Sequence, residues 1–327
     1  MQTAVTKTSL TVSRIGLGCM GMSEFYGQSD PDQARRVLER ALELGVAFLD
    51  TADIYGRGDN ERLIGGFVRA NRERVVIATK CGIVRGATPA DQTRDTRPAY
   101  IRSACEASLR RLGVEAIDLF YLHRLDGVTP IEDSVGELSR LVDEGKIGHV
   151  GLSEVSVDQL LQAHRVHPIA AVQSEYSLST RGPDVEAMID ACADLGALFV
   201  PFSPLGRGLL TAAYRSPDDF KGADFRTILP RFQPGALEQN IAVVDRLAGI
   251  AAGKACTPAQ LALAWVLARG SHVVPIPGTR RLDRLAENVA ALDVLLSRDD
   301  LAAIERAAPI DAIVGDRYPA SLAPRKS

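Results

Sequence analysis

Four side chains with catalytic potential follow three successive apolar runs of the sequence. Asp50 ends the first run, Lys80 and His123 directly follow the second and third, and Tyr55 lies shortly after Asp50. The runs are residues 47–50, 75–79 and 118–122. Neighbouring parallel strands lie roughly 4.8 Å apart and end at the same edge, so we expect all four side chains in one small pocket.

These residue types suit proton transfer to a substrate oxygen. Tyrosine has an unperturbed pKa of about 10, so it is a poor proton donor at neutral pH. A neighbouring Lys80 ammonium lowers that pKa by stabilising the phenolate, and Asp50 keeps the lysine charged and in place. A neutral His123 can orient a carbonyl group by hydrogen bonding. The set predicts proton transfer through Tyr55 that needs no metal ion.

Other catalytic classes match the sequence less well. One His and one Asp do not close a metal site, and no G-x-S-x-G motif indicates a serine hydrolase. Residues 16–21 (GLGCMG) match G-x-G-x-x-G. A Rossmann turn opens directly into a helix, however, and no helix is expected here before Pro31. A lyase or isomerase with Lys80 as a Schiff base is a further interpretation, disfavoured because Asp50 keeps the lysine charged.

The elements that must position these residues alternate short apolar runs with amphipathic stretches. Near-continuous apolar runs are typical of parallel strands buried on both faces. Eight such runs with intervening helices predict an α/β fold, a (β/α)8 TIM barrel that forms a single domain over residues 1–327. The runs are residues 14–18, 47–50, 75–79, 118–122, 149–152, 170–173, 197–200 and 272–276. The expected helices are residues 31–44, 98–112, 131–144, 157–165, 183–195, 237–252, 258–268, 281–292 and 298–307.

Three segments extend this barrel. The first residues are expected to form a β-hairpin across the bottom of the barrel. Residues 204–235 form a long loop after the seventh strand, and the chain after Pro309 reads as an irregular tail.

Composition limits the partners of this protein. The 38 Lys and Arg residues against 41 Asp and Glu residues give a net charge of −3, without the basic excess that nucleic-acid or membrane-surface binding normally requires. No apolar run is long enough to span a bilayer, and the N-terminus lacks the apolar core of a signal peptide. Five scattered cysteines without a C-x-x-C pair favour reduced thiols. We expect a cytoplasmic protein that binds neither nucleic acid nor membrane.

Three sequence blocks resemble the catalytic signatures of the aldo-keto reductases. They are residues 48–56 (FLDTADIYG), 78–80 (ATK) and 122–124 (LHR). The resemblance extends over nearly the whole chain, and residues 172–181 and 315–319 resemble a bacterial and plant branch of the family. The resemblance implies reversible reduction of aldehydes or ketones by NADPH without a metal. Tyr55 would be the general acid, Lys80 and Asp50 would tune it, and Tyr55 and His123 would contact the carbonyl substrate.

The resemblance also implies a binding path for the cofactor. Ser153 and Gln173 would hold the nicotinamide carboxamide, and Phe202 would stack on the ring. The residues expected to bind the cofactor are Met20, Asp50, Ser153, Gln173, Phe202, Ser203, Leu205, Arg207, Thr279, Arg280, Arg284, Glu287 and Asn288. Those between 203 and 207 would follow the pyrophosphate under the long loop, which would act as a clasp. Those from 279 onward match the block for the adenosine 2′-phosphate, and their arginines favour NADPH over NADH because guanidinium pairs well with phosphate.

Three positions depart from the family pattern. Glu154 replaces a common Asn, Phe202 a frequent Tyr and Ser179 a Trp, so the nicotinamide contacts and the size of the pocket are expected to differ. The family also includes potassium-channel β subunits, and a cofactor-binding regulatory subunit with little turnover is the alternative function. The intact catalytic set argues against it. The sequence leaves open the individual aldehyde or ketone, the physiological direction and the oligomeric state.

Overall fold

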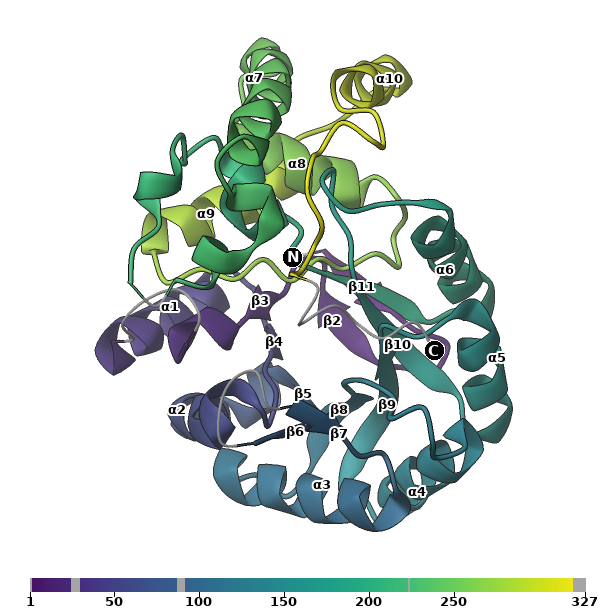
Figure 1. The fold of residues 1–327 in the computed structure, drawn as a ribbon. Helices are drawn as coiled ribbons and strands as arrows, with labels where there is room; N and C mark the ends of the chain where they lie inside the picture. The colour runs from purple at the N-terminus through teal and green to yellow at the C-terminus, as the bar shows by residue number, and fades with distance from the viewer. Residues whose placement is uncertain (1, 25–29, 87–91, 223, 320–327) are drawn as a thin grey trace.

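The computed structural model describes residues 2–24, 30–86, 92–222 and 224–319. Seven parallel strands form one curved sheet with helices packed around its outside (Figure 1). Their order across the sheet is β11-β10-β9-β8-β5-β4-β3. The strands are β3 (Leu17–Gly18), β4 (Phe48–Asp50), β5 (Val76–Cys81), β8 (Ile117–Leu122), β9 (Ile147–Ser153), β10 (Ile169–Glu175) and β11 (Leu198–Phe202). This arrangement confirms the predicted (β/α)8 TIM-barrel fold.

The expected eighth strand, residues 272–276, bonds to both β11 and the start of β3 but forms no regular strand. Two of its amides donate to carbonyls of β11 at 2.9 and 3.0 Å. On the other side, the carbonyls of Pro275 and Pro277 accept from Gly16 and Gly18 at 2.9 and 3.4 Å. Proline has no N–H, so the bonds that these two residues would donate toward β3 are missing. The segment therefore closes the barrel with an incomplete ladder.

Arg14 reinforces the same junction. Its Nη1 donates to the carbonyls of Ser271 and Val273, both at 2.7 Å. Its Nη2 donates to those of Leu267 and Gly270 at 3.5 and 3.3 Å. Burial lowers the pKa of this guanidinium. One side chain thus holds together parts of the chain that lie 253 to 259 positions apart.

Alternate strand residues face two hydrophobic clusters, as the two-residue period of a strand requires. In β8, Leu119 and Tyr121 belong to the inner cluster, and Phe120 and Leu122 belong to the outer one under the helices. The antiparallel hairpin of β1 (Thr3–Val5) and β2 (Thr11–Ser13) adds its buried apolar side chains to the inner cluster. The amide of Lys7, in the hairpin turn, bonds to a carbonyl just before β11. The hairpin therefore covers the N-terminal ends of the strands, as predicted.

The helices follow the predicted amphipathic stretches, with one addition. They are α1 (Pro31–Glu43), α2 (Asp59–Ala70), α3 (Pro98–Leu112), α4 (Ile131–Asp143), α5 (Val157–Val166), α6 (Pro183–Leu195), α7 (Ala236–Gly253), α8 (Pro258–Leu267), α9 (Leu282–Ala290) and α10 (Arg298–Ala307). At α1, the side chain of Asp30 accepts from two first-turn amides and Pro31 occupies the first turn. Among the described residues between β3 and α1, the one helical element is a short 3₁₀ turn, η1 (Met20–Met22). The GLGCMG segment therefore does not lead directly into an α-helix, as expected.

Helix α2 was absent from the sequence prediction because polar residues interrupt its buried face. Asn60 and Glu61 are both fully buried there. The side chain of Asn60 accepts from Thr51 Oγ1 at 2.6 Å and donates to the carbonyl of Cys19 at 2.8 Å. These bonds replace the apolar contacts that a helical pattern normally reveals. The helix thereby secures the loops after β3 and β4, where site residues are expected.

Two adjacent glycines of α2 provide a test of its packing. A Cβ added at Gly65 would lie 2.7 Å from the carbonyl oxygen of Leu112, whereas one at Gly66 would meet nothing within 4 Å. We expect Gly65→Ala to lower the free energy of unfolding by about 1–3 kcal/mol through overpacking. Gly66→Ala should raise it by up to about 1 kcal/mol through helix propensity. Urea titration of both variants checks this, and equal changes would contradict the close approach of α2 and α3.

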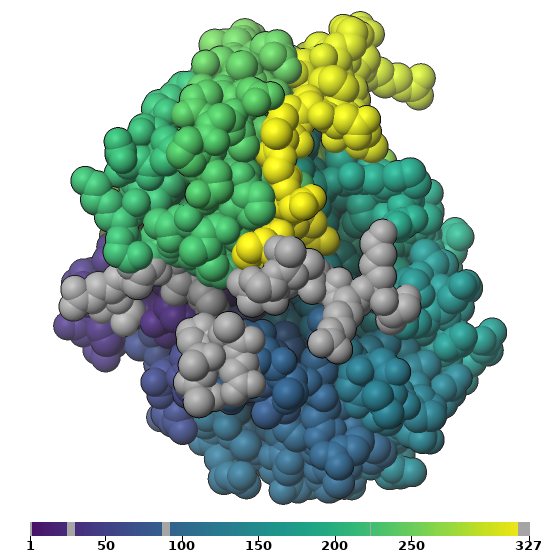
Figure 2. All heavy atoms as spheres, viewed as in Figure 1, coloured from purple at the N-terminus to yellow at the C-terminus, as the bar shows by residue number. Residues whose placement is uncertain are grey.

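The connections after the strands carry further structure. A short antiparallel hairpin of β6 (Ile83–Arg85) and β7 (Gln92–Arg94) follows β5 and was not predicted. The long loop after β11, predicted as residues 204–235, contains the 3₁₀ turns η4 (Gly206–Thr211), η5 (Pro217–Asp219), η6 (Phe225–Ile228) and η7 (Pro230–Phe232). After α10 the tail runs back along the boundary between this loop region and the teal part of the barrel (Figure 2).

The described residues contain no group of three or more His, Cys, Asp or Glu side chains placed to hold a metal ion. All five cysteines are free thiols. Within the same part of the chain, no single helix is long and apolar enough to cross a membrane. Helices α7 and α8 are long and apolar enough only when taken together, and they are bent by 85° relative to each other.

Candidate active site

Asp50 and Lys80 form a buried ion pair at the C-terminal ends of β4 and β5. Lys80 Nζ donates to Asp50 Oδ1 at 2.5 Å and to the carbonyl of Thr51 at 2.7 Å. The Lys80 side chain is fully buried and that of Asp50 is 3% exposed. The second carboxylate oxygen of Asp50 accepts from Gln173 Nε2 at 2.8 Å. The lysine is therefore fixed from two sides, and three strands contribute to its surroundings.

Tyr55 and His123 complete this group. Tyr55 begins the 3₁₀ turn η2 (Tyr55–Gly58), in which Gly56 and Arg57 have positive φ angles of 56° and 55°. This left-handed turn separates Tyr55 from α2. The ring centre of Tyr55 lies 5.3 Å from Lys80 Nζ, and 6.0 Å from the His123 ring, which it meets at 86°. The structure thus brings together all four side chains that the sequence predicted to share a pocket.

The pKa values in this site have identifiable causes. Burial by itself would lower the pKa of Lys80, but the charges and hydrogen bonds of Asp50 and Tyr55 together outweigh it, so the pKa is raised and the lysine stays charged. Burial raises the pKa of Tyr55, and the Lys80 charge pulls it part of the way back. Burial, with the charges of Arg124 and Lys80, holds the pKa of His123 well below its usual range. The site therefore combines a charged lysine, a protonated phenol and a neutral imidazole at neutral pH.

His123 has hydrogen-bonding capacity left for a ligand. Its backbone amide is fixed to the carbonyl of Cys81 at 2.7 Å. Its Nδ1 is buried without a hydrogen-bond partner within the described part of the chain. A buried polar atom of this kind is costly unless something binds it. Beside the phenol of Tyr55, such an imidazole fits a carbonyl or hydroxyl oxygen.

Ser153 and Gln173 present complementary groups to an amide. These residues are register partners at the ends of β9 and β10. Gln173 uses its Nε2 on Asp50, which leaves its carbonyl oxygen as an acceptor. Ser153 Oγ accepts from Arg124 Nη1 at 3.0 Å, which leaves its hydroxyl proton to donate. One acceptor and one donor are what a nicotinamide carboxamide requires, so these residues fit the predicted cofactor.

The stacking and clasp positions lie at the end of β11. Phe202 ends that strand and is half-buried, and Ser203 follows with a φ of 50°. Leu205 precedes the turn η4, in which Arg207 and Gly208 also have positive φ angles. The side chain of Arg207 pairs with Glu175 at 3.3 Å and donates to Tyr318 Oη at 2.8 Å. Its predicted role toward the pyrophosphate stays a prediction.

The predicted phosphate block lies around the start of α9. Thr279 Oγ1 accepts from the Arg281 amide at 3.1 Å, and Arg284 pairs with Glu287 at 2.7 Å. Asn288 is buried and Arg280 is half-buried. The remaining predicted residue, Met20, is half-buried in η1, where the adjacent Cys19 amide bonds to the carbonyl of Asp50. The block thus lies after the segment that closes the barrel, next to β3.

Sequence reasoning missed the partners of Glu154. This residue has a left-handed φ of 53°, and its Oε1 accepts from the Glu175 amide at 2.8 Å. Its Oε2 accepts from Arg317 Nη2 at 3.0 Å. The spacing of Glu154, Glu175 and Arg317 gives no sequence signal, because a contact across 163 positions depends on the path of the tail.

Comparisons with known proteins identify the family and the fold of this chain. The model of the aldo/keto reductase family matches residues 14–309. The glycerol dehydrogenase AKR11B4 from Gluconobacter oxydans has a similar structure, with a TM-score of 0.85 and 29% identity over 94% of this chain and 96% of that one. The aldo-keto reductase AKR11C1 from Bacillus halodurans, in its holo form, gives a TM-score of 0.73 and 27% identity over 95% and 97% of the two chains. The match over residues 14–309 shows that the chain belongs to the aldo-keto reductase family of oxidoreductases.

Proposed function

We propose that this protein reduces aldehydes or ketones to alcohols with NADPH and that Tyr55 is the general acid. The observation that carries the proposal is the buried Lys80–Asp50 pair beside the Tyr55 ring, with a neutral His123 at the same edge. Family membership supports carbonyl reduction with a nicotinamide cofactor. The phenol is the one group of this set that holds a transferable proton next to a fixed positive charge.

Each residue has a separate role in the proposed reduction. His123 donates a hydrogen bond that orients the substrate carbonyl, and Tyr55 Oη gives its proton to the same oxygen. Lys80 stabilises the resulting phenolate, while Asp50 holds the ammonium in place. The nicotinamide, when bound between Ser153, Gln173 and Phe202, supplies the hydride for the carbonyl carbon. In the overall reaction, one carbonyl, one NADPH and one proton give one alcohol and one NADP⁺.

A substrate survey tests this proposal directly. Aldehydes and ketones of increasing size are offered with NADPH, and cofactor oxidation is followed by its absorbance. Because one structural neighbour is a glycerol dehydrogenase, glycerol with NADP⁺ is included in the opposite direction. We expect turnover with at least one carbonyl class. Tight NADPH binding without turnover of any carbonyl would contradict the proposal.

We further propose that Arg284 recognises the 2′-phosphate of NADPH. A guanidinium–phosphate contact is a charge-assisted hydrogen bond worth about 1.5–3 kcal/mol. Arg284→Ala should therefore raise the KM for NADPH roughly tenfold to a hundredfold and that for NADH less than about twofold. Arg298→Ala, at an exposed position that begins α10, is the control for loss of one positive charge. Equal changes for both cofactors would remove Arg284 from the phosphate site.

We also propose a cytoplasmic location. The free state of all five cysteines, four of them buried, supports it because reduced thiols persist in a reducing compartment. Fractionation of the cells that produce the protein tests this, and recovery outside the cytoplasm would contradict it.

A further inference from the structure

Two carboxylates lie side by side where β9 and β10 end. Glu154 directly follows the last residue of β9, and Glu175 is the last residue of β10. The Glu175 side chain is 2% exposed and that of Glu154 is 13% exposed. A carboxylate as buried as that of Glu175 requires a positive partner, since an unpaired buried charge is strongly destabilising. The partners come from elsewhere in the chain.

Arg317 in the tail supplies the positive charge that both carboxylates share. Its Nη2 lies 3.0 Å from Glu154 Oε2 and 3.0 Å from Glu175 Oε2, and its Nε donates to Glu175 at 3.1 Å. Burial would raise the pKa of Glu175, but the charges of Arg207, Arg317 and Arg231 outweigh it and hold the pKa below its usual range. Glu175 is therefore a carboxylate at neutral pH.

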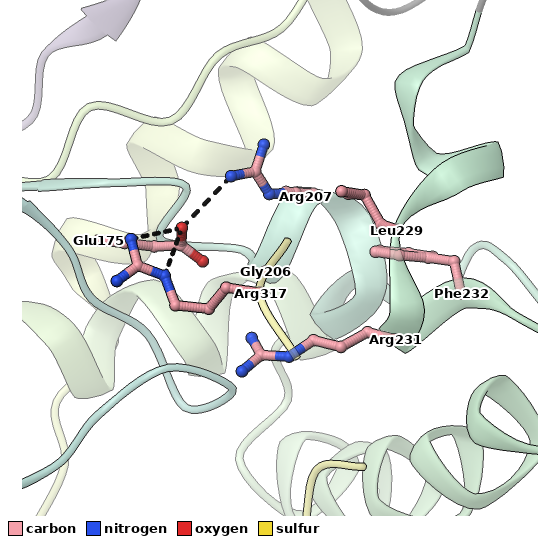
Figure 3. Close-up of a pocket in the computed structure, with 7 residues that line it drawn as sticks. All are labelled: Glu175, Gly206, Arg207, Leu229, Arg231, Phe232 and Arg317. Carbon is pink, nitrogen blue, oxygen red and sulfur yellow. Dashed lines mark hydrogen bonds and ion pairs between the residues drawn. The ribbon is translucent and has the colours of Figure 1, made fainter. Parts of the chain in front are cut away.

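Arg207 connects this group to the long loop after β11. Its Nη2 contacts Glu175 and also donates to Tyr318 Oη, in the tail, at 2.8 Å. Figure 3 shows the Glu175 carboxylate between the guanidinium groups of Arg207 and Arg317, with Arg231 nearby. The cavity between them has room for roughly one water molecule. The tail and the loop are therefore locked together with little space to spare.

The tail is guided into this position by a second set of contacts. The side chain of Asn240, on α7, donates to the carbonyl of Val314 at 3.0 Å and accepts from its amide at 2.7 Å. Arg231 donates to the carbonyl of Gly315 at 3.0 Å. Gly315 has a φ of 93°, and an added Cβ would lie 2.9 Å from the Arg231 amide nitrogen. Arg317 thus reaches the two carboxylates from a backbone that is already fixed.

We propose that Arg317 is a positioning residue that fastens the tail and the loop after β11 over the cofactor, and that its ion pairs with Glu154 and Glu175 must break before the cofactor can leave. The inference rests on the proposed function, because it places the cofactor beside Ser153, Gln173 and the loop. Glu154 adjoins Ser153, and Glu175 lies two residues after Gln173. Arg317 therefore links the nicotinamide end of the site to the loop expected along the pyrophosphate.

The test compares Arg317→Met with Arg317→Lys and with Arg306→Ala, an exposed arginine of α10, as the control. Dissociation of NADPH is followed by stopped-flow fluorescence with excess NADP⁺ as the trap. Arg317→Met should release NADPH about tenfold faster, as loss of charge-assisted bonds predicts. Arg317→Lys should recover most of the difference, because it restores the charge, and Arg306→Ala should change nothing. Release within twofold of the parent for Arg317→Met would overturn the proposal.

A second measurement separates this proposal from the proposed function. Hydrogen exchange of the Val314 amide reports on the tail without cofactor, because that amide donates to Asn240. Arg317→Met should speed its exchange about tenfold, and Glu154→Gln should add little in the double variant, because Glu154 acts through Arg317. Unchanged exchange would show that Arg317 does not hold the tail. A parent protein that fails to bind NADPH yet shows faster exchange in the variant would instead refute the proposed function and the link to cofactor release.

Discussion

Tyr55→Phe is expected to lower kcat for carbonyl reduction by about 10³-fold while leaving the affinity for NADPH unchanged. The variant removes the proton that the proposed mechanism passes to the substrate oxygen, and general acid catalysis contributes about 10²- to 10⁴-fold. The phenylalanine ring can still occupy the space beside Lys80 and His123. The measurement combines steady-state turnover with NADPH titration by quenching of protein fluorescence.

Tyr121→Phe is the matched control for this variant. The ring centre of Tyr121 also lies near Lys80 Nζ, at 5.9 Å, and its hydroxyl is buried without a hydrogen-bond partner among the described residues. Both variants therefore delete one hydroxyl from a buried ring near the same ammonium. We expect Tyr121→Phe to retain turnover within about twofold, since Tyr121 belongs to the inner cluster and passes no proton to the substrate in the proposed mechanism. Full turnover by Tyr55→Phe would exclude the proposed acid.

Lys80→Met is expected to lower kcat by a similar factor, about 10³-fold, for a different reason. Burial raises the pKa of Tyr55, and the Lys80 charge is the largest effect that opposes it. Without this charge the pKa rises further, so the phenol becomes a weaker acid. Alcohol oxidation needs the phenolate, so its rate in the variant should stay low until a higher pH than in the parent. Rates in both directions from pH 6 to 10 check this.

A second variant separates lost chemistry from lost stability. Lys80→Met alone leaves Asp50 as a buried carboxylate without its cation, which costs about 3–5 kcal/mol. Asp50→Asn in the same chain removes that charge and keeps an oxygen for Gln173 Nε2. The double variant should recover most of the free energy of unfolding but none of the activity. Recovery of turnover together with stability would show that the ion pair only supports the fold.

The sequence predicts the parts of the fold that repeat and misses the parts that depend on polar burial. Apolar runs and proline-led helix starts identified the strands and nearly all helices. Helix α2 escaped because Asn60 and Glu61 bury polar groups where a periodic pattern expects apolar ones. The eighth strand had the right composition, but Pro275 and Pro277 remove the amides that a regular ladder needs.

The candidate site likewise has a part that the sequence predicts and a part that it does not. Asp50, Tyr55, Lys80 and His123 were predictable because strand ends on neighbouring strands must meet at one edge of the barrel. The contacts of the tail were not predictable, because no local sequence pattern determines where a segment without regular secondary structure packs. Glu154 illustrates the difference. Its departure from the family pattern was visible in the sequence, but its partner Arg317 became visible only with the path of the tail.

The junction at Arg14 has a consequence for the order in which the chain folds during synthesis. The carbonyls that Arg14 binds are made 253 to 259 residues later, which corresponds to roughly 13 to 50 s at 5–20 residues per second. Over that interval β3 has no neighbour on its outer edge, and such an edge is open to mispairing. Final closure of the barrel is therefore a late event, because it waits for the synthesis of residues 267–277. We expect chains shortened before this segment to expose the β3 edge and to aggregate.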